Sequence, residues 1–361
     1  MVTSKYAKGE SVTLQTVADR LGVSRTTVSN AYGRPDQLNP ALRERVLRVA
    51  KELGYSGPDP AARSLRRGRS GAIGVLYAES LTYAFTDPGA VLFLQGVADA
   101  TCGAGVGLLI LPVPPGQSAA PAAVHEAVVD AFISFSVLDD AAALAAILER
   151  GLPTVIVDAP RRDGITFVGI DDRTAARTCA EHLLALGHRR IAVLATRLAL
   201  DDYRGAADVA RQEATVDTVL RTRLHGYADA VRAAGLAWEA IQVEECEANT
   251  IEAGCRGAAT LLDRSPRPTA ILTVTDQLAL GALQAARQRA VRVPEGLSVV
   301  GFDDIPAAAT SIPPLTTLRQ PLLEKGRVAG QLILQPAAAE APEVILPTEL
   351  VVRASTGPAP T

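Results

Sequence analysis

The spacing of apolar residues near the start of the chain predicts two short helices joined by a tight turn. In the first helix the apolar positions recur every three or four residues, at Leu14, Val17, Ala18 and Leu21. Thr13 is placed to cap this helix, and Gly22 is placed to end it. Ser24 then stands where a second N-cap is needed, and Val28 and Ala31 give the next helix an apolar face.

A third helix is predicted from its own start and stop signals. Asn39 is a suitable N-cap, Pro40 occupies the first helical position and Gly54 follows the last. Its inward positions are Leu42, Val46, Val49 and Leu53. We therefore expect residues 1–57, called the head below, to form an all-α domain built on a helix-turn-helix. The spacing alone also fits a plain αα-hairpin.

From Gly71 onward, short apolar runs alternate with Ala-rich helical stretches. The strand-like runs are IGVLY, VGLLILPV, AFISFSV and TVIVD in a first series, and FVGID, IAVLA, AILTV and LSVVGFD in a second. This alternation predicts βαβ units, and hence two α/β lobes, each with a doubly wound, mainly parallel sheet, in residues 71–361, called the body below. Ligands of such sheets bind at the carboxyl ends of the strands, so the cleft between the lobes is the expected site.

Composition and charge separate the two parts further. The chain has 361 residues and a net charge of −3, but residues 1–70 hold 13 Lys and Arg against 6 Asp and Glu. The first part is therefore at +7 and the remainder at −10. A basic head on an acidic body suggests that the head meets a polyanion, although charge alone also fits chance clustering of solvated arginines.

Other broad classes of protein are disfavoured. The longest apolar runs are well short of the roughly 18 residues that a membrane span needs, so no membrane partner is expected. The N-terminus has no apolar stretch of signal-peptide length, which predicts a cytoplasmic protein. The four cysteines are too irregularly spaced for a disulfide framework or a zinc knuckle and are expected to be buried: Cys102, Cys179, Cys246 and Cys255.

Side chains on the outer face of the second helix suit DNA recognition. Arg25, Thr26 and Asn30 are expected where a docked helix-turn-helix presents side chains to the major groove. Arginine pairs with guanine and asparagine with adenine through two hydrogen bonds each. The short hydroxyls suited to phosphate oxygens are those of Ser24, Thr27 and Ser29.

With these residues in view, the head resembles the DNA-binding domain of the lactose-repressor and galactose-repressor (LacI/GalR) family of bacterial transcription regulators. The likeness continues through GPDPAARSLRRGRS, EHLLALGHRRIAVL, TDQLALGAL, VVGFDD, IPPLTTLRQP and LPTELVVRAST. It implies a head at 1–57, a hinge at 58–70 and a periplasmic-binding-protein-like effector domain at 71–361. The N-lobe would span about 71–169 and 321–345, and the C-lobe about 170–320 and 346–356.

The resemblance also implies a homodimer on near-palindromic double-stranded operator DNA. Paired hinge helices in this family push a leucine into the minor groove, and the matching residue here is Leu65, flanked by Arg66. An apolar wedge beside an arginine fits that groove chemically. A solvated linker is the alternative, because Pro58, Pro60 and Gly68 also suit a connector.

For the effector, the resemblance implies contacts from four residues: Asp158, Arg223, Thr275 and Asp303. Carboxylates and a guanidinium suit the hydroxyls of a polyol. Tyr83 and Phe85 could stack on a ring, although a core role fits them nearly as well. Segment 196–221 is longer than the lactose repressor's own connection, and we expect it to contribute to a wall of the pocket.

Other polar residues have simpler interpretations. Asp171, Asp172 and Asp276 open helices and could be caps, and His182 and His188 suit a surface or helix-end role better than metal binding. GAGVGL from Gly103 precedes a strand and lacks a third glycine, so it is not a dinucleotide fingerprint. No catalytic motif, cofactor site or metal site is recognised, and we do not expect an enzyme.

The sequence therefore predicts a DNA-binding transcription regulator, a repressor, whose operator affinity depends on a small effector. A sugar or a nucleoside or purine would fit the family. The alternative is a cytoplasmic sugar- or nucleoside-binding protein without regulatory DNA binding. The effector itself, its sign of action and the target genes stay open at this point.

Overall fold

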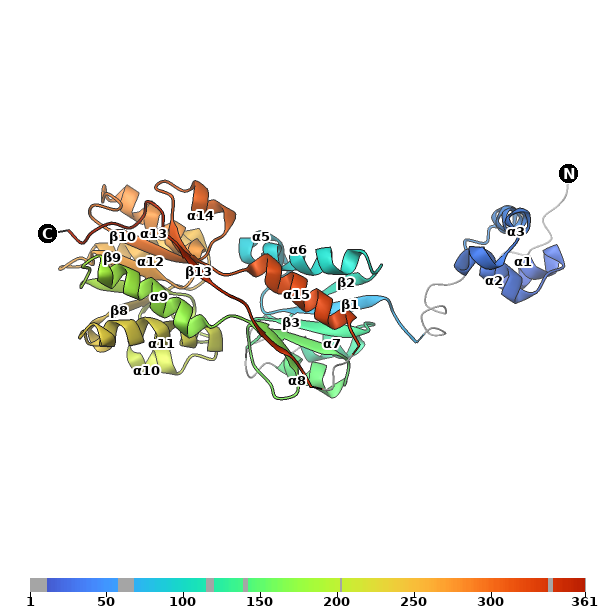
Figure 1. Cartoon of the computed structure of the whole chain (residues 1–361), viewed down its shortest axis with the longest axis horizontal. Helices are drawn as coiled ribbons and strands as arrows, with labels where there is room; N and C mark the ends of the chain where they lie inside the picture. Colours follow the sequence, from blue (N-terminus) through green and yellow to red (C-terminus); the bar gives the residue numbers. More distant parts are fainter. Residues whose placement is uncertain are drawn as a thin grey trace. The chain divides into compact units, whose positions relative to one another are not determined.

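The computed structural model describes residues 12–57, 68–114, 120–138, 142–201, 203–336 and 340–360. The chain forms two compact units, Met1–Ser70 and Gly71–Thr361 (Figure 1). Leu65 and Arg66, the residues expected to bind in the minor groove, lie outside the described residues.

The first unit contains the three predicted helices. They are α1 (Leu14–Leu21), α2 (Arg25–Gly33) and α3 (Pro40–Leu53), with a short 3₁₀ turn, η1 (Pro35–Gln37), before α3. The hydroxyl of Thr13 accepts a hydrogen bond from Thr16 N–H, and Gly22 ends α1 in the left-handed conformation at φ 67°. The predicted starts of all three helices, and the predicted ends of α1 and α3, are thus confirmed.

The core of this unit is small and formed by six buried side chains: Val17, Ala18, Val28, Ala31, Val46 and Ala50. The small Ala18 allows α1 to approach α2 closely. The sequence prediction was wrong for Val49, which is only half-buried, while Ala50 takes the inward position.

The N-lobe of the body is a six-stranded sheet with the order β12-β5-β4-β3-β1-β2. Its strands are β1 (Ala72–Tyr77), β2 (Gly107–Pro112), β3 (Ala131–Phe135), β4 (Thr154–Val157), β5 (Thr166–Gly169) and β12 (Glu343–Ile345), and neighbouring strands run parallel. Its helices are α5 (Leu81–Thr86), α6 (Pro88–Cys102), α7 (Ala120–Glu126), α8 (Ala142–Glu149) and α15 (Leu322–Leu334). Helices α6 and α15 cover one face side by side, and α7 and α8 cover the other (Figure 1).

The C-lobe is a seven-stranded sheet with the order β13-β11-β10-β9-β6-β8-β7. Its strands are β6 (Ile191–Ala195), β7 (Gly205–Ala206), β8 (Gln242–Glu245), β9 (Ala270–Thr273), β10 (Ser298–Asp303), β11 (Thr316–Arg319) and β13 (Glu349–Val351). Its helices are α9 (Asp172–Ala185), α10 (Val209–Glu213), α11 (Thr218–Ala233), the 3₁₀ turn η2 (Trp238–Ala240), α12 (Ile251–Leu262), α13 (Asp276–Gln288) and α14 (Pro306–Thr310). Among the described strands of this sheet, only the edge strands β7 and β13 pair antiparallel. The predicted fold class is therefore confirmed.

The chain crosses between the lobes three times. The crossings follow β5, β11 and β12, because β5 and β12 belong to the first sheet while β11 and β13 belong to the second. Each lobe is built from separate stretches of chain, so neither corresponds to one continuous segment. The three crossings connect the two lobes covalently into one body.

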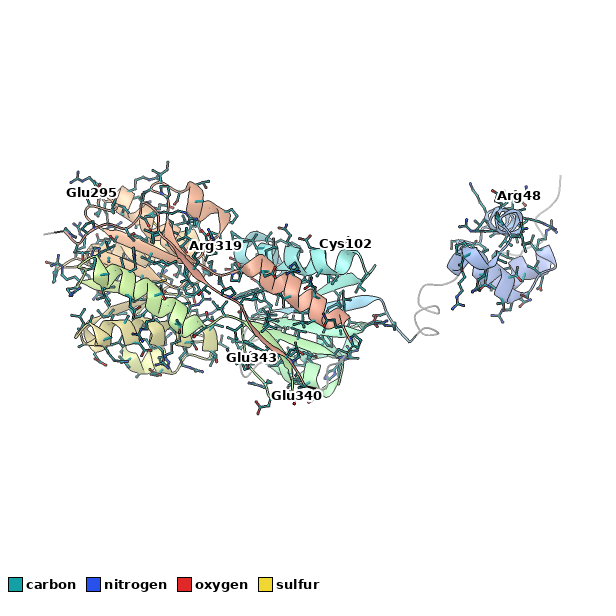
Figure 2. The ribbon with its side chains drawn as sticks, viewed as in Figure 1. Arg48, Cys102, Glu295, Arg319, Glu340 and Glu343 are labelled. Atoms are coloured by element: carbon teal, nitrogen blue, oxygen red, sulfur yellow. The ribbon has the colours of Figure 1, made fainter. Side chains whose placement is uncertain are left out.

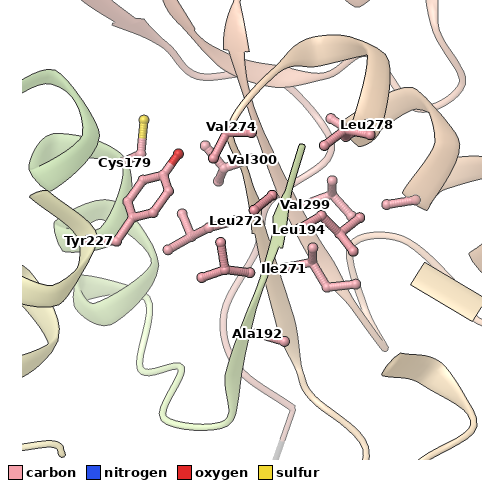
Figure 3. Packing of buried hydrophobic residues seen from close by; sticks show 14 of the residues in the cluster. Cys179, Ala192, Leu194, Tyr227, Ile271, Leu272, Val274, Leu278, Val299 and Val300 are labelled. Carbon is pink, nitrogen blue, oxygen red and sulfur yellow. The ribbon is translucent and has the colours of Figure 1, made fainter. Parts of the chain in front are cut away.

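The C-lobe core is packed on both faces of its sheet. Figure 3 shows neighbouring residues Ile271 and Leu272 of β9 projecting to opposite sides of the sheet. Tyr227 and Cys179 lie on the side of Leu272, and Leu278 of α13 lies on the other. Successive strand residues alternate in direction, so a strand covered by helices on both faces must be apolar throughout. The run AILTV has this pattern.

The cysteines are less uniform than expected. All four are free thiols; Cys179 and Cys246 are buried, as predicted, but Cys255 is only half-buried. Cys102 is exposed at the end of α6, which contradicts the prediction that all were buried (Figure 2).

Charged side chains such as Glu295, Arg319 and Glu343 project from the surface of the body (Figure 2). In the described residues, no helix is long and apolar enough to cross a membrane.

Close packing of α6 on α15 predicts a sensitive glycine. A Cβ on Gly96 would overlap the carbonyl oxygen of Leu323, whereas a Cβ on Gly103 would meet nothing within 4 Å. Gly96→Ala is expected to lower the free energy of unfolding by about 1 to 3 kcal/mol, because backbone must move to make room. Gly103→Ala is the control and is expected to change it by about 0.5 kcal/mol or less. Urea unfolding of both variants tests this, and equal stabilities would contradict it.

Candidate functional site: recognition helix and interlobe pocket

The first candidate site is the outer face of α2. Ser24, Arg25 and Thr26 are exposed, while Thr27, Ser29 and Asn30 are partly buried. Helix α2 is held from behind by Val28 and Ala31, which are fully buried in the head's core. The packing of α2 therefore fixes the backbone of Arg25, while its exposed side chain can reach a partner outside the head.

Two of the predicted phosphate contacts already serve the helix itself. The Ser24 hydroxyl accepts a hydrogen bond of 3.0 Å from Thr27 N–H, and the two hydroxyls lie 2.9 Å apart. This N-cap fixes the start of α2, so Ser24 positions the recognition residues whether or not it also touches a phosphate. Asn30 Nδ2 lies 3.5 Å from the Gln37 side-chain oxygen, a weak hydrogen bond that leaves the amide available to a partner.

The second candidate site is a cavity of about 340 Å³ between the two lobes of the body. Its wall comes from the carboxyl ends of strands in both sheets, including residues after β1, β3, β4, β6, β9 and β10. Five of the six predicted effector residues line it: Tyr83, Asp158, Arg223, Thr275 and Asp303. A volume of this size suits a ligand of one or two small rings.

Arg223 is the cation at the centre of the C-lobe side. Its Nε donates to Asp172 at 2.8 Å, and its Nη1 donates to the carbonyl oxygen of Val274 at 2.8 Å. The guanidinium carbon lies 3.7 Å from the centre of the Phe302 ring, and Asp303 is 3.9 Å from Nη1. These contacts fix the guanidinium in place before any ligand arrives.

Lys325 provides the matching cation on the N-lobe side, and the sequence analysis missed it. Its ammonium is fully buried and donates to Asp158 and to Gln320, at 2.5 Å each. Gln320 in turn donates its amide to Asp303. Lys325 occupies a position on the inner face of the amphipathic helix α15 where an apolar residue is expected. This departure from the apolar pattern is the feature of the sequence that could have identified it.

This chain of contacts places two carboxylates in unusual conformations. Asp158 has φ 67° and Asp303 has φ 131°, both in the region that favours glycine. Burial raises the pKa of the Asp303 carboxyl to about 8, although nearby Arg223 acts in the opposite direction. Strained backbone and a carboxyl with a perturbed pKa at the ends of two strands are features common at functional sites, so this point is a candidate binding site.

The two aromatic candidates separate. Tyr83 lines the pocket, stacks at 6.4 Å from Tyr77 and donates its hydroxyl to the carbonyl oxygen of Asn249 across the lobes at 3.0 Å. Phe85 does not line the pocket and is 62% exposed. Residues 81–86 form the helix α5, and residues two apart on a helix face different directions. The expected contact from Phe85 is therefore wrong for this conformation.

Segment 196–221 forms a wall of the pocket, as expected. It contributes Leu198, Leu200, Val216, Asp217 and Leu220 to the lining. Arg211 fastens this wall: it bonds the buried Glu245 of β8 at 2.5 Å and Asp201 at 2.7 Å, and lies over the Tyr203 ring. The segment thus acquires the short strand β7 and helix α10 and is held to the sheet from behind.

The remaining acidic candidates have distinct structural roles. Asp171 caps α9 by accepting from Thr174 N–H at 3.0 Å, as one interpretation predicted. Asp172 is not a cap; it is the partner of Arg223. Thr275 caps α13, and Asp276 is buried, accepting from Thr317 and from Ile305 N–H. His188 bonds Thr269 and Ser298 in the C-lobe interior, a structural role.

A helix-turn-helix unit and a two-lobed body with a polar interlobe pocket define a class of protein, the ligand-responsive DNA-binding regulator. Two family models match the chain. "Bacterial regulatory proteins, lacI family" matches residues 13–57, and "Periplasmic binding protein-like domain" matches residues 180–356.

Known relatives match along nearly the whole length. An HTH-type transcriptional regulator of Mycobacterium tuberculosis is 44% identical over 350 residues, covering 96% of this chain and 97% of its own. The crystal structure of the lac repressor dimer bound to operator and the anti-inducer ONPF is 28% identical with a TM-score of 0.77, covering 96% of this chain and 100% of that one. A transcriptional regulator CelR–cellobiose complex is 28% identical with a TM-score of 0.69 and the same coverage.

The chain belongs to the LacI family of bacterial regulatory proteins. It is a DNA-binding transcription regulator and not an enzyme. The family, the fold and the class of function predicted from the sequence are thereby confirmed.

The buried pair of Lys325 and Asp158 generates a stability prediction. Lys325→Met keeps the volume but leaves Asp158 buried without its cation, which is expected to lower the free energy of unfolding by about 3 to 5 kcal/mol. Arg173→Met is the control, because its pair with Asp229 is largely exposed and is expected to contribute about 1 kcal/mol or less. Urea unfolding monitored by circular dichroism measures both. Equal losses would mean that the Lys325 charge is not needed.

Proposed function

We propose that this protein is a homodimeric repressor whose affinity for a near-palindromic operator is set by a small effector bound between the lobes. The observation that supports this most strongly is the interlobe pocket, into which Asp158 of the N-lobe and Arg223, Thr275 and Asp303 of the C-lobe converge. Hydroxyl groups of a sugar or nucleoside match these carboxylates and the guanidinium.

The proposed reading of DNA uses α2. Arg25, Thr26 and Asn30 contact base edges in the major groove, and Ser24, Thr27 and Ser29 contact phosphate oxygens. Residues 58–70 act as the hinge, with Leu65 and Arg66 in the minor groove at the centre of the operator. Two-fold symmetry follows from pairing two heads on two half-sites. The lac repressor, a similar protein, is a dimer on its operator.

Effector control is proposed to work through contacts that cross the pocket. Glu79 of the N-lobe and Arg197 of the C-lobe pair at 3.1 Å, and the Tyr83 hydroxyl bonds Asn249 across the same opening. A ligand that joins both lobes stabilises one lobe arrangement over another and so shifts the population that binds operator well. Cellobiose, in the complex with a similar regulator, supports a sugar or related polyol as the effector.

The proposal is tested by screening sugars and nucleosides for a rise in melting temperature, followed by operator binding with and without each hit. A ligand that binds only the folded protein must raise the melting temperature. A hit that changes operator affinity by about 5- to 150-fold would support effector control. If the ligands that bind leave operator affinity unchanged, the body binds small molecules without controlling DNA binding, and the proposal of effector control is wrong.

Arg25 is expected to read a base. Arg25→Ala should weaken specific binding by about 1 to 3 kcal/mol and relax preference at one position in each half-site. Arg48→Ala, on the exposed side of α3, is the control. Fluorescence anisotropy with operators substituted at each position measures the change. A uniform loss over all sequences would instead make Arg25 a phosphate contact.

Asp303 is expected to bind the effector without affecting DNA. Asp303→Ala should weaken binding of the ligand identified by the screen by about 1 to 3 kcal/mol, because a buried hydrogen-bonding group is lost. The operator affinity of the ligand-free protein should be retained. Asp263→Ala, at an exposed pair with Arg289, is the control. Equal loss of DNA binding by a folded Asp303 variant would contradict the assignment.

A further inference from the structure

Four helices begin at the pocket, and their N-cap residues line it. They are α6, α11, α12 and α13, with N-caps Asp87, Asp217, Thr250 and Thr275. The N-terminus of a helix is ordinarily a good site for a phosphate, because its free N–H groups and the helix dipole attract negative charge. The pocket therefore has the backbone geometry of an anion site.

Each of these helix ends is already occupied by the protein's own side chain. Asp87 accepts from Ala90 N–H at 2.9 Å, and Asp217 accepts from Leu220 N–H at 3.0 Å. A phosphate entering here would have to displace a cap or lie against a carboxylate. Both carboxyls are buried, and burial raises the pKa of each, because negative charge is poorly solvated at these positions. A phosphate placed beside them would add further negative charge to the same poorly solvated site.

The cations at the pocket are also engaged. Arg197 pairs with Glu79, Arg223 bonds both Asp172 and the Val274 carbonyl, and Lys325 bonds Asp158. In the described part of the chain, the basic residues of the lining are Arg197 and Arg223, whereas the acidic ones are Glu79, Asp87, Asp158, Asp217, Glu247 and Asp303. Acidic side chains therefore outnumber basic ones in the lining.

We propose that the pocket accepts an uncharged polyhydroxylated ligand and excludes its phosphorylated form, and that Asp87 and Asp217 impose this choice. This inference rests on the proposed effector site and narrows its ligand class. Carboxylate oxygens accept strong hydrogen bonds from hydroxyls but repel the charge of about −1.5 to −2 on a phosphate. The stacked rings of Tyr77, Tyr83 and Phe135 provide an apolar wall for a ring face.

The test uses inorganic phosphate as the probe and needs no knowledge of the effector. Melting temperatures are measured in about 10 mM phosphate against chloride of equal ionic strength, for the wild type and the double variant Asp87→Asn/Asp217→Asn. Asparagine retains the N-cap and removes the charge, so both helices keep their caps. Asp208→Asn is the matched control, because Asp208 caps α10 outside the pocket.

We expect the phosphate-dependent rise of the double variant to exceed that of the wild type and of Asp208→Asn by about 2 °C or more. The basic head is the same in all three proteins, so phosphate bound there contributes equally to each. A rise in the wild type as large as that in the double variant would overturn the inference, since the two carboxylates would then exclude nothing. No rise in the double variant would overturn it as well, because the two carboxylates would not be what excludes phosphate.

A second comparison separates this inference from the proposed function. Any sugar or nucleoside that stabilises the wild type is compared with its own phosphate ester. Stabilisation by both to the same extent would overturn the charge selection and leave the effector site in place. If no sugar or nucleoside raises the melting temperature, the result counts against the proposed effector site. The measurement with inorganic phosphate would still show whether Asp87 and Asp217 exclude an anion from the pocket.

Discussion

The buried ammonium of Lys325 is the contact on which the arrangement of the pocket depends. It fixes Asp158 at the end of β4 and, through Gln320, the position of Asp303 at the end of β10. Gln320 lies in one of the three crossings between the lobes, so a single cation connects a helix, a crossing and a strand end from each sheet. Without it, Asp158 would be a buried carboxylate without its cation, and Asp303 would lose the bridge through Gln320 and keep Arg223, 3.9 Å away, as its nearby cation.

The fold supplies the polar groups of the pocket as a consequence of its topology. Parallel strands in both lobes end at the same opening, and the helices that follow them begin there. Caps, ion pairs and ligand contacts therefore compete for the same few side chains. Thr275 illustrates this, since one hydroxyl caps α13 and bonds the Asn249 side chain at 2.6 Å. A ligand in this site must exchange hydrogen bonds with the protein rather than fill empty ones.

The sequence predicted most of the fold, because periodic apolar residues and caps report local structure directly. Thr13, Gly22, Ser24 and Gly54 set helix ends that the structure reproduces. What it could not predict depends on contacts between distant residues. Lys325 and Asp158 are far apart in the chain, and the pairing of Asp172 with Arg223 was hidden behind its position at a helix start. The contact from Phe85 was predicted wrongly because a helix of six residues is too short for its apolar periodicity to be recognised in the sequence.

The wall made by segment 196–221 has an evolutionary consequence. It is one contiguous stretch, fastened from behind by Arg211 to Glu245 and Asp201, and it shares no residue with the three crossings. Substitutions, insertions or deletions within it can therefore reshape the pocket while the lobe connections and the head stay unchanged. A lineage, or an engineer who wants a sensor for a new metabolite, can alter what such a regulator detects without rebuilding how it responds, provided that Arg197 and its pair with Glu79 are kept.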